Sequence, residues 1–264
     1  TLSWGCNRPP EIAEITLMGN HYTGVEYTVS AAAADPDGDS LSYKWSLTGG
    51  SINDSHANPI KWTTPDTPGD YDITVEASDG NGGTATKTET VTVLLNIISA
   101  NLPLVVAEGG YLEQGGITGA GSYLYAGDTF HKKPCKGFAS FNITGISGAE
   151  IQSATLTFNI THVYNDPSFY GDLYINVLDW GAEPIIQADF GTIGIPVEGF
   201  SSSGDGNITC SANKLKEELQ KAINDGKSRF QVRIHFTGPF SDNDNETDGW
   251  RYDQSDVNLH IEYT

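Results

Sequence analysis

The densest group of potential ligands in this sequence is an acidic turn. Asp35, Asp37 and Asp39 occupy alternate positions around Gly38. Hard cations such as Ca²⁺ prefer several oxygen ligands, and carboxylates this close together repel one another unless a cation lies between them. Asp79, in a later Asp-Gly turn, would join the group if the intervening strands pack as a sandwich. The pattern predicts a calcium site; the alternative is a solvated turn whose carboxylates bind the backbone.

The sequence lacks the common catalytic patterns. Its histidines show no His-Glu-x-x-His spacing, and no Gly-x-Ser-x-Gly or phosphate-binding glycine loop occurs. A second acidic run, residues 242–249, is typical of a solvated loop between strands. We therefore expect a protein that is not an enzyme.

Aromatic side chains offer a second kind of chemistry, because exposed rings stack on the faces of sugars. The candidates for a carbohydrate site are Trp250, Tyr252 and Tyr170, with Tyr164, Phe169 and Trp180 in a wider set. The alternative for each is a ring packed in the core at the base of a loop.

The three cysteines lack the spacing of zinc or redox motifs. Cys135 and Cys210 lie in the same half of the chain, where they form either a disulfide or two buried thiols. Cys6 follows Leu2-Ser3-Trp4-Gly5, which loosely resembles a bacterial lipobox. Cys6 is thus a candidate for lipidation, an intermolecular crosslink or an ordinary thiol.

The net charge of the chain and its expected location limit the classes of partner that it could bind. Acidic residues outnumber basic ones 34 to 14, for a formal net charge of -20, so nucleic acid is excluded as a partner and no membrane span is expected. We expect an extracellular or cell-surface location. Five sequons permit glycosylation, at Asn53, Asn142, Asn159, Asn207 and Asn245.

The first part of the chain shows strand periodicity. Residues 41–47, 71–77 and 84–93 alternate apolar and polar positions, with Gly, Pro and Asp turns between them. Several short strands within a hundred residues indicate a β-sandwich.

The second part is also mainly β. Residues 154–160, 230–236 and 257–263 alternate in the same way. One helix is predicted over 211–225, with Ser211 as N-cap and Gly226 at its C-terminal end. We expect an all-β chain: an N-terminal segment (1–8), an immunoglobulin-like sandwich (9–95), and a jelly-roll-like sandwich with one short helix (96–264).

Two resemblances support this division. Residues 34–45 (Ala-Asp-Pro-Asp-Gly-Asp-Ser-Leu-Ser-Tyr-Lys-Trp) and 69–80 resemble the PKD and cadherin-like modules of microbial surface proteins. The resemblance implies that Trp45 is the central core tryptophan and that Tyr71 forms a tyrosine corner. Residues 137–143, 148–156 and 259–263 more weakly resemble DNRLRE-type jelly-roll domains, some of which bind carbohydrate.

The leading hypothesis is a structural or adhesive cell-surface protein, stiffened by calcium and assembling with like subunits or other surface proteins. The competing hypothesis is a carbohydrate-binding module, with polysaccharide as its partner. A third is an accessory subunit of a secreted enzyme.

Overall fold

The computed structural model describes residues 6–264 except 117, 166, 203–204 and 239–245, and the chain divides into two units, Thr1–Asn96 and Ile97–Thr264. Both units are built from antiparallel sheets, and among the described residues one pair of strands, in the first unit, is parallel. This architecture confirms the all-β prediction. Among the residues that the structure describes, no helix has the length and apolarity needed to cross a membrane.

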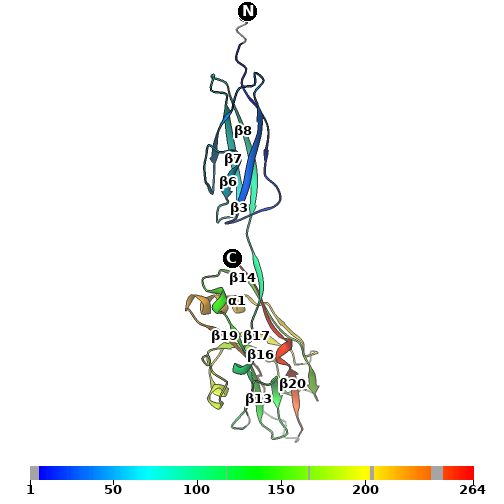
Figure 1. Ribbon diagram of the computed structural model, residues 1–264. Helices are drawn as coiled ribbons and strands as arrows, with labels where there is room; N and C mark the ends of the chain where they lie inside the picture. Colours follow the sequence, from blue (N-terminus) through cyan, green and yellow to red (C-terminus); the bar gives the residue numbers. More distant parts are fainter. Residues whose placement is uncertain (1–5, 117, 166, 203–204, 239–245) are drawn as a thin grey trace, which may run out of the picture. The chain divides into compact units, whose positions relative to one another are not determined.

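The first unit is a sandwich of two four-stranded sheets (Figure 1). One sheet has the order β1 (Glu11–Thr16), β3 (Glu26–Ala34), β6 (Ile60–Thr63), β5 (Ser51–Ile52). The other has the order β2 (His21–Tyr22), β8 (Thr84–Leu94), β7 (Gly69–Ser78), β4 (Ser42–Leu47). Alternate side chains of both sheets meet in one apolar core.

Two tryptophans and one tyrosine organise this core. Trp45 is 3% exposed and Trp62 is fully buried, and each indole nitrogen donates to a backbone carbonyl. The Tyr71 hydroxyl donates to the carbonyl of Thr67 at 2.9 Å. This bond, from a strand residue back to the preceding turn, is the expected tyrosine corner.

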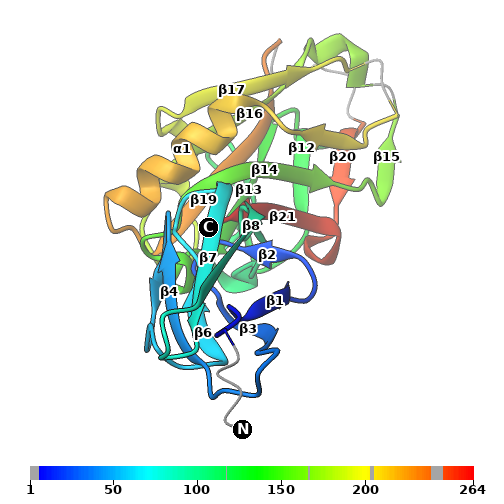
Figure 2. The same cartoon turned by 90° about the horizontal axis from the view of Figure 1, so that it is seen from above.

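The second unit is a larger sandwich (Figures 1 and 2). Its nine-stranded sheet follows the path β15 (His162–Tyr164), β20 (Asp248–Tyr252), β12 (Leu124–Asp128), β13 (Pro134–Asn142), β19 (Arg229–Phe236), β16 (Leu173–Leu178), β17 (Ile195–Phe200). Off this path, β10 (Gly110–Glu113) pairs with β13 and with β11 (Thr118–Ala120). The opposing sheet has the order β18 (Ile208–Cys210), β14 (Ile151–Phe158), β21 (Val257–Tyr263), β9 (Ile98–Leu102).

A single α-helix among the described residues, α1 (Asn213–Asn224), packs against β14, β17 and β19 and adds Leu215, Leu219 and Ile223 to the main core. Its N-cap is Ala212 rather than the predicted Ser211, because the Ser211 hydroxyl hydrogen-bonds to Thr155 instead. Five 3₁₀ helices occur in the described residues, at Val106–Glu108, Thr144–Ile146, Pro167–Tyr170, Gln187–Gly191 and Gln254–Asp256.

The nine-stranded sheet is covered on both faces. One face joins the main core, and the other holds a smaller cluster of Leu112, Phe138, Leu178, Ile185 and Phe190. An ion pair links the segment before β10 to the centre of this sheet. The Glu108 carboxylate accepts from Arg229 of β19 at 2.8 Å and from Ser140 of β13 at 2.7 Å.

Truncating the deepest indole tests the sandwich core of the first unit. Trp62→Ala is expected to reduce the free energy of unfolding by about 3–5 kcal/mol, because it leaves a large cavity and an unpaired Gly49 carbonyl. Chemical denaturation of the full chain measures the loss. Met18→Ala, at a side chain that is 82% exposed, is the control and is expected to change almost nothing. Equal effects of the two substitutions would contradict this core.

Candidate functional site

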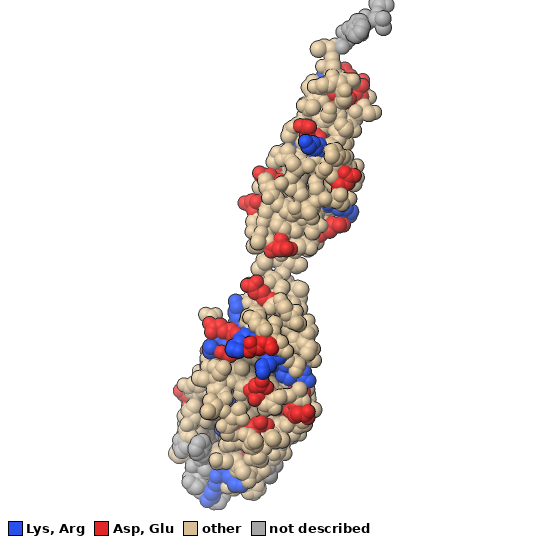
Figure 3. All heavy atoms as spheres, turned by 90° about the vertical axis from the view of Figure 1, so that its left-hand side faces the viewer, with Lys and Arg blue, Asp and Glu red and all other residues tan. Residues whose placement is uncertain are grey.

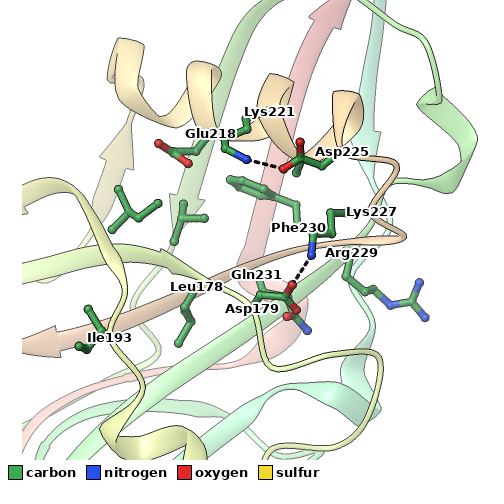
Figure 4. A pocket seen from close by; sticks show the side chains of 13 residues that line it. Leu178, Asp179, Ile193, Glu218, Lys221, Asp225, Lys227, Arg229, Phe230 and Gln231 are labelled. Atoms are coloured by element: carbon green, nitrogen blue, oxygen red, sulfur yellow. Dashed lines mark hydrogen bonds and ion pairs between the residues drawn. The ribbon is translucent and has the colours of Figure 1, made fainter.

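Two hollows in the second unit could receive a ligand. A groove of about 330 Å³ lies between α1 and the strands β16 and β19 (Figure 4). A pocket of about 210 Å³, which we call the tyrosine pocket, is lined by Tyr111, Glu113, Tyr123, Tyr125, Thr129, Phe130, His131, Tyr164 and Thr247. The two hollows differ in the chemistry of their walls.

The groove beside α1 is bordered by charges that already have partners. Lys227 pairs with Asp179 at 2.7 Å, and Lys221 pairs with Asp225 (Figure 4). Figure 3 likewise shows acidic and basic side chains intermingled on this unit. The exposed apolar residues in the groove are Ile193 and Ile195, and the aromatic ring among its described lining residues, Phe230, is 1% exposed. The groove therefore offers a ligand little beyond apolar contact.

The tyrosine pocket is built where three strands and a loop converge. Tyr111 lies on β10, Tyr125 on β12 with Tyr123 just before it, and Tyr164 on β15. Tyr123 and Tyr125 are two residues apart, so both project from the same face of the strand. Residues 129–131 come from the loop between β12 and β13.

The rings of the pocket are held in fixed relative orientations. Tyr111 stacks on Tyr123, with centroids 5.1 Å apart and planes 13° apart. Tyr125 meets Tyr111 and Tyr164 edge-on, at centroid distances of 6.5 and 5.7 Å. The Arg251 guanidinium lies 4.1 Å from the centroid of Tyr123. Such contacts restrict ring motion and leave half-buried aromatic surface facing the hollow.

Burial also affects the acidity of these phenols. It raises the pKa of Tyr111 to about 12, with the neighbouring Tyr123 adding to the shift. The pKa of Tyr125 is raised further by the same cause, and its hydroxyl lies 2.7 Å from the carbonyl oxygens of both Asp128 and Asp248. Tyr111 and Tyr125 are therefore neutral hydrogen-bonding groups at ordinary pH.

Glu113 is the acidic group of the pocket. Its carboxylate accepts from Thr129 at 2.9 Å and from His131 at 3.1 Å, and Lys133 lies 3.6 Å away. Burial by itself would raise the pKa of Glu113, but these hydrogen bonds and positive charges outweigh it and lower the pKa. The pocket therefore combines aromatic faces with an ionised carboxylate and hydroxyl groups.

The predicted carbohydrate-binding residues lie elsewhere. Trp250 is 2% exposed and packs on Phe236, Tyr252 is fully buried, and Tyr170 is 2% exposed. Their assignment as a sugar platform is wrong, because Trp250 and Tyr252 belong to the inward face of β20 and not to a loop. Tyr164, from the wider set, does line the tyrosine pocket.

The other pocket tyrosines, Tyr111, Tyr123 and Tyr125, were not among the predicted site residues. The signal available was the Tyr123-Leu124-Tyr125 alternation, in which aromatic residues share one face of a strand. Of the second acidic run, residues 242–245 lie outside the described residues. Asp248 is 4% exposed and stands opposite Asp128 on β12, so this end of the run is strand rather than solvated loop.

The predicted disulfide is also wrong. Cys135 lies on β13 of the nine-stranded sheet and Cys210 on β18 of the opposing sheet, and both are buried free thiols. Burial raises the pKa of Cys135 and raises that of Cys210 to about 12, so both stay protonated and unreactive. Cys6 is an exposed free thiol, and its lipidation or crosslinking stays a prediction.

The acidic turn of the first unit is held by donors of the protein. Arg8 binds Asp37 through its guanidinium at 2.7 Å, Asn7 donates to Asp79 at 2.8 Å, and the Asn81 side chain donates to Asp39. The Arg8 hydrogen bonds lower the pKa of Asp37. Among the described residues, no three carboxylate, histidine or cysteine side chains are grouped to hold a metal ion.

One carboxylate oxygen of this turn differs from the rest. The Asp35 Oδ1 accepts from the amides of Asp37 and Asp39, whereas its Oδ2 is buried without a hydrogen-bond partner among the described residues. As placed, the four carboxylates do not form a calcium cage, since Arg8 occupies Asp37. The calcium site stays a prediction.

The sequons lie in varied surroundings. Asn53, Asn159 and Asn207 are exposed, Asn142 is half-buried, and Asn245 lies outside the described residues. The Asn207 side chain accepts from the amide of Ile160 and that of Asn53 from Lys61. Their glycosylation stays a prediction.

Comparison with known proteins identifies part of the chain. Residues 16–92 match the PKD domain family, which agrees with the resemblance drawn from the acidic turn and the tyrosine corner. No curated protein matches this sequence.

Solved structures give only distant likenesses. A carbohydrate-binding module of the β-sandwich superfamily is 11% identical, with 98% of this chain and 93% of that chain covered and a TM-score of 0.30. SGBP-B from the Bacteroides ovatus mixed-linkage glucan utilization locus, solved in complex with a mixed-linkage heptasaccharide, is 14% identical, with 91% of this chain and 50% of that chain covered and a TM-score of 0.22.

A nucleoside hydrolase-related hypothetical protein from Saccharophagus degradans is 22% identical over 34% of this chain, with a TM-score of 0.27. The chain spans about a quarter of that protein's length, 26%. Likenesses this low say nothing of the ligand of this chain.

The carboxylate of Glu113 gives the pocket a testable pH dependence. Its folded-state pKa lies below the ordinary 4.5, so its ionised form adds stability that is complete above that value and is lost as pH falls through the folded pKa. The difference in unfolding free energy between wild type and Glu113→Gln is expected to shrink between about pH 7 and about pH 3. Denaturant titrations at both pH values measure it. The exposed Glu183→Gln is the control, and a gap for Glu113→Gln that does not change with pH would contradict this arrangement.

Proposed function

We propose that this chain is a non-enzymatic carbohydrate-binding protein of the cell surface, which binds a sugar in the tyrosine pocket of its second unit. The observation that carries the proposal is the stacked pair Tyr111–Tyr123 at a hollow of about 210 Å³. Sugar rings present apolar C–H faces and polar edges. An aromatic wall with a carboxylate and hydroxyl groups nearby matches both.

The polar groups of the pocket suit neutral sugars. The phenol groups both donate and accept, so sugar hydroxyls find partners of either kind. Glu113, whose side chain is 3% exposed and already accepts from Thr129 and His131, holds the loop residues of the pocket in place. The chain's net charge of -20 also disfavours strongly anionic ligands at an acidic pocket. A volume of about 210 Å³ is below the range of drug-sized pockets, which favours a single sugar unit.

The match of residues 16–92 to the PKD domain supports a surface role for the first unit, as a spacer that carries the binding unit. Adhesion through like subunits or other surface proteins stays a prediction. Such assembly could use strand addition of an N-terminal segment such as Thr1–Cys6 to a neighbour's sheet edge, and residues 1–5 of that segment lie outside the described residues. The accessory-subunit hypothesis is compatible with the same pocket, since such a subunit would bind the enzyme's polysaccharide substrate.

Removing one wall of the tyrosine pocket tests the proposal. Screening neutral oligosaccharides on a glycan array finds a ligand, and calorimetric titration measures its affinity. Tyr123→Ala is expected to weaken binding at least about tenfold, because it removes the ring on which Tyr111 stacks and which Arg251 covers.

Two exposed phenylalanines give a matched control. Phe130 lines the pocket and is 62% exposed, and Phe130→Ala is expected to weaken binding. Phe169 is 53% exposed but does not line the pocket, so Phe169→Ala is expected to leave binding unchanged. Binding that is unchanged in Tyr123→Ala would overturn the proposal, and so would the absence of any glycan ligand.

The calcium prediction for the first unit has its own test. If calcium binds the acidic turn, it displaces Arg8 from Asp37, and Asp37→Ala combined with Asp39→Ala removes the heat of calcium binding. Arg8→Gln is expected to tighten calcium binding by removing the competing cation. Equal calcium heats in wild type and the double variant would contradict a calcium site here.

A further inference from the structure

A group of basic side chains lies on the face of the nine-stranded sheet opposite the main core. Arg233 of β19 stands opposite Phe138 of β13 and Asn176 of β16. Two residues along β19, His235 stands opposite Tyr174. The register of β13 continues to place Lys136 beside His235. Side chains two apart share a face, so Lys136, Arg233 and His235 project from the same side of adjacent strands.

These cations lack a counter-charge. Arg233 is 5% exposed, and its guanidinium donates to the carbonyl of Thr192 at 2.7 Å while its Nε is buried without a hydrogen-bond partner among the described residues. Lys136 donates to the carbonyl of Phe190 at 2.9 Å and lies 4.2 Å from the centroid of that ring. In the part of the chain that the structure describes, no carboxylate pairs with either cation.

Burial and the neighbouring positive charges together lower the pKa values of Lys136 and His235. Burial, and then the charge of Arg233, lower the pKa of Lys136 to about 8. Burial lowers the pKa of His235 to about 4, and the charges of Arg233 and Lys136 add to the shift. Burying like charges without an opposite one is costly, and in a chain with a net charge of -20 acidic partners were abundant.

A single short segment supplies the present acceptors. Phe190 and Thr192 lie at the end of the 3₁₀ helix Gln187–Gly191, and both cations donate to their neutral carbonyls. Hydrogen bonds between a cation and an anionic oxygen are about twice as strong as those between neutral groups. The cavity beside Lys136 and His235 is about 10 Å³, room for about one water, and neither Phe190 nor Thr192 lines it. An anion that contacts both Lys136 and Arg233 therefore has to take the place of the Phe190 and Thr192 carbonyls.

We propose that Lys136 and Arg233 form an anion site that binds one carboxylate or sulfate group of a ligand in place of the Phe190 and Thr192 carbonyls. His235 borders this site as a neutral ring, whose nitrogens lie 3.0 Å from the Phe236 carbonyl and 3.2 Å from the Asn176 Oδ1. Two sources share this chemistry: the carboxylate of a uronic acid sugar, and a free inorganic oxyanion. The site is separate from the tyrosine pocket. In the register of β10 with β13, Glu113 pairs with Cys135 and the next residue, Leu112, pairs with Lys136, so Glu113 and Lys136 project from opposite faces of these two strands, and neither Lys136 nor Arg233 lines the tyrosine pocket.

Calorimetric titration of the full chain with sodium sulfate and with sodium glucuronate, at constant ionic strength, tests the site. Wild type is expected to give saturable binding of at least one of the two. Lys136→Met keeps the apolar stem without the charge and is expected to weaken that binding at least about tenfold. The separate variant Lys136→Arg keeps the charge and is expected to retain binding. Lys227→Met, at a surface lysine already paired with Asp179, is the matched control and is expected to leave it unchanged.

The outcomes separate the two sources and the two sites. Binding of glucuronate but not of glucose or sulfate supports an acidic sugar as the ligand, and binding of sulfate alone supports an inorganic oxyanion. Tyr123→Ala is expected to leave either response intact, whatever becomes of neutral sugar binding. No saturable response in wild type to either anion would overturn the proposal, as would equal responses in wild type and Lys136→Met.

Discussion

The close approach of β12 and β20 is the constraint on which the tyrosine pocket of the second unit depends. Gly127 and Gly249 stand directly opposite each other in this pair. A Cβ on Gly127 would lie 1.9 Å from the carbonyl oxygen of Asp248, and one on Gly249 would lie 2.2 Å from that of Ala126. Both glycines have positive φ, 148° and 145°, so no other residue type fits either position without moving the strands.

This approach fixes the floor of the tyrosine pocket. With the strands this close, the Tyr125 hydroxyl lies within hydrogen-bonding distance of the carbonyls at both Asp128 and Asp248. The immobilised ring then meets Tyr111 and Tyr164 edge-on, and Tyr111 in turn stacks on Tyr123. Rigid rings lose little conformational entropy when a ligand binds, which is the property that a weak, stacking-based site requires.

The sequence predicted the features that depend on local patterns. Alternation identified the strands, and the helix predicted over 211–225 is present as α1, Asn213–Asn224. The strands and the helix follow from periodicity within one element, and tertiary contacts reinforced it. The Tyr71 corner was implied by the resemblance to PKD modules, and the structure contains it.

The features that depend on pairing across long stretches of chain were beyond sequence reasoning. The tyrosine pocket needs β12 and β15 to pair with β20, which is distant from them in the chain, and β10 to pair with β13. The same pairing turned Trp250 inward and placed Cys135 and Cys210 in different sheets. The unpaired charges of Lys136 and Arg233 became visible only once the strands were in register.

Contact between a sugar and the tyrosine pocket is measured directly by nuclear magnetic resonance of the full chain with ¹³C-labelled tyrosine rings, titrated with a neutral oligosaccharide ligand. Saturable shifts are expected in the ring signals of Tyr111 and Tyr123, while Tyr22 and Tyr71 of the first unit stay unchanged. Saturable binding that leaves the Tyr111 and Tyr123 signals unmoved would contradict the account.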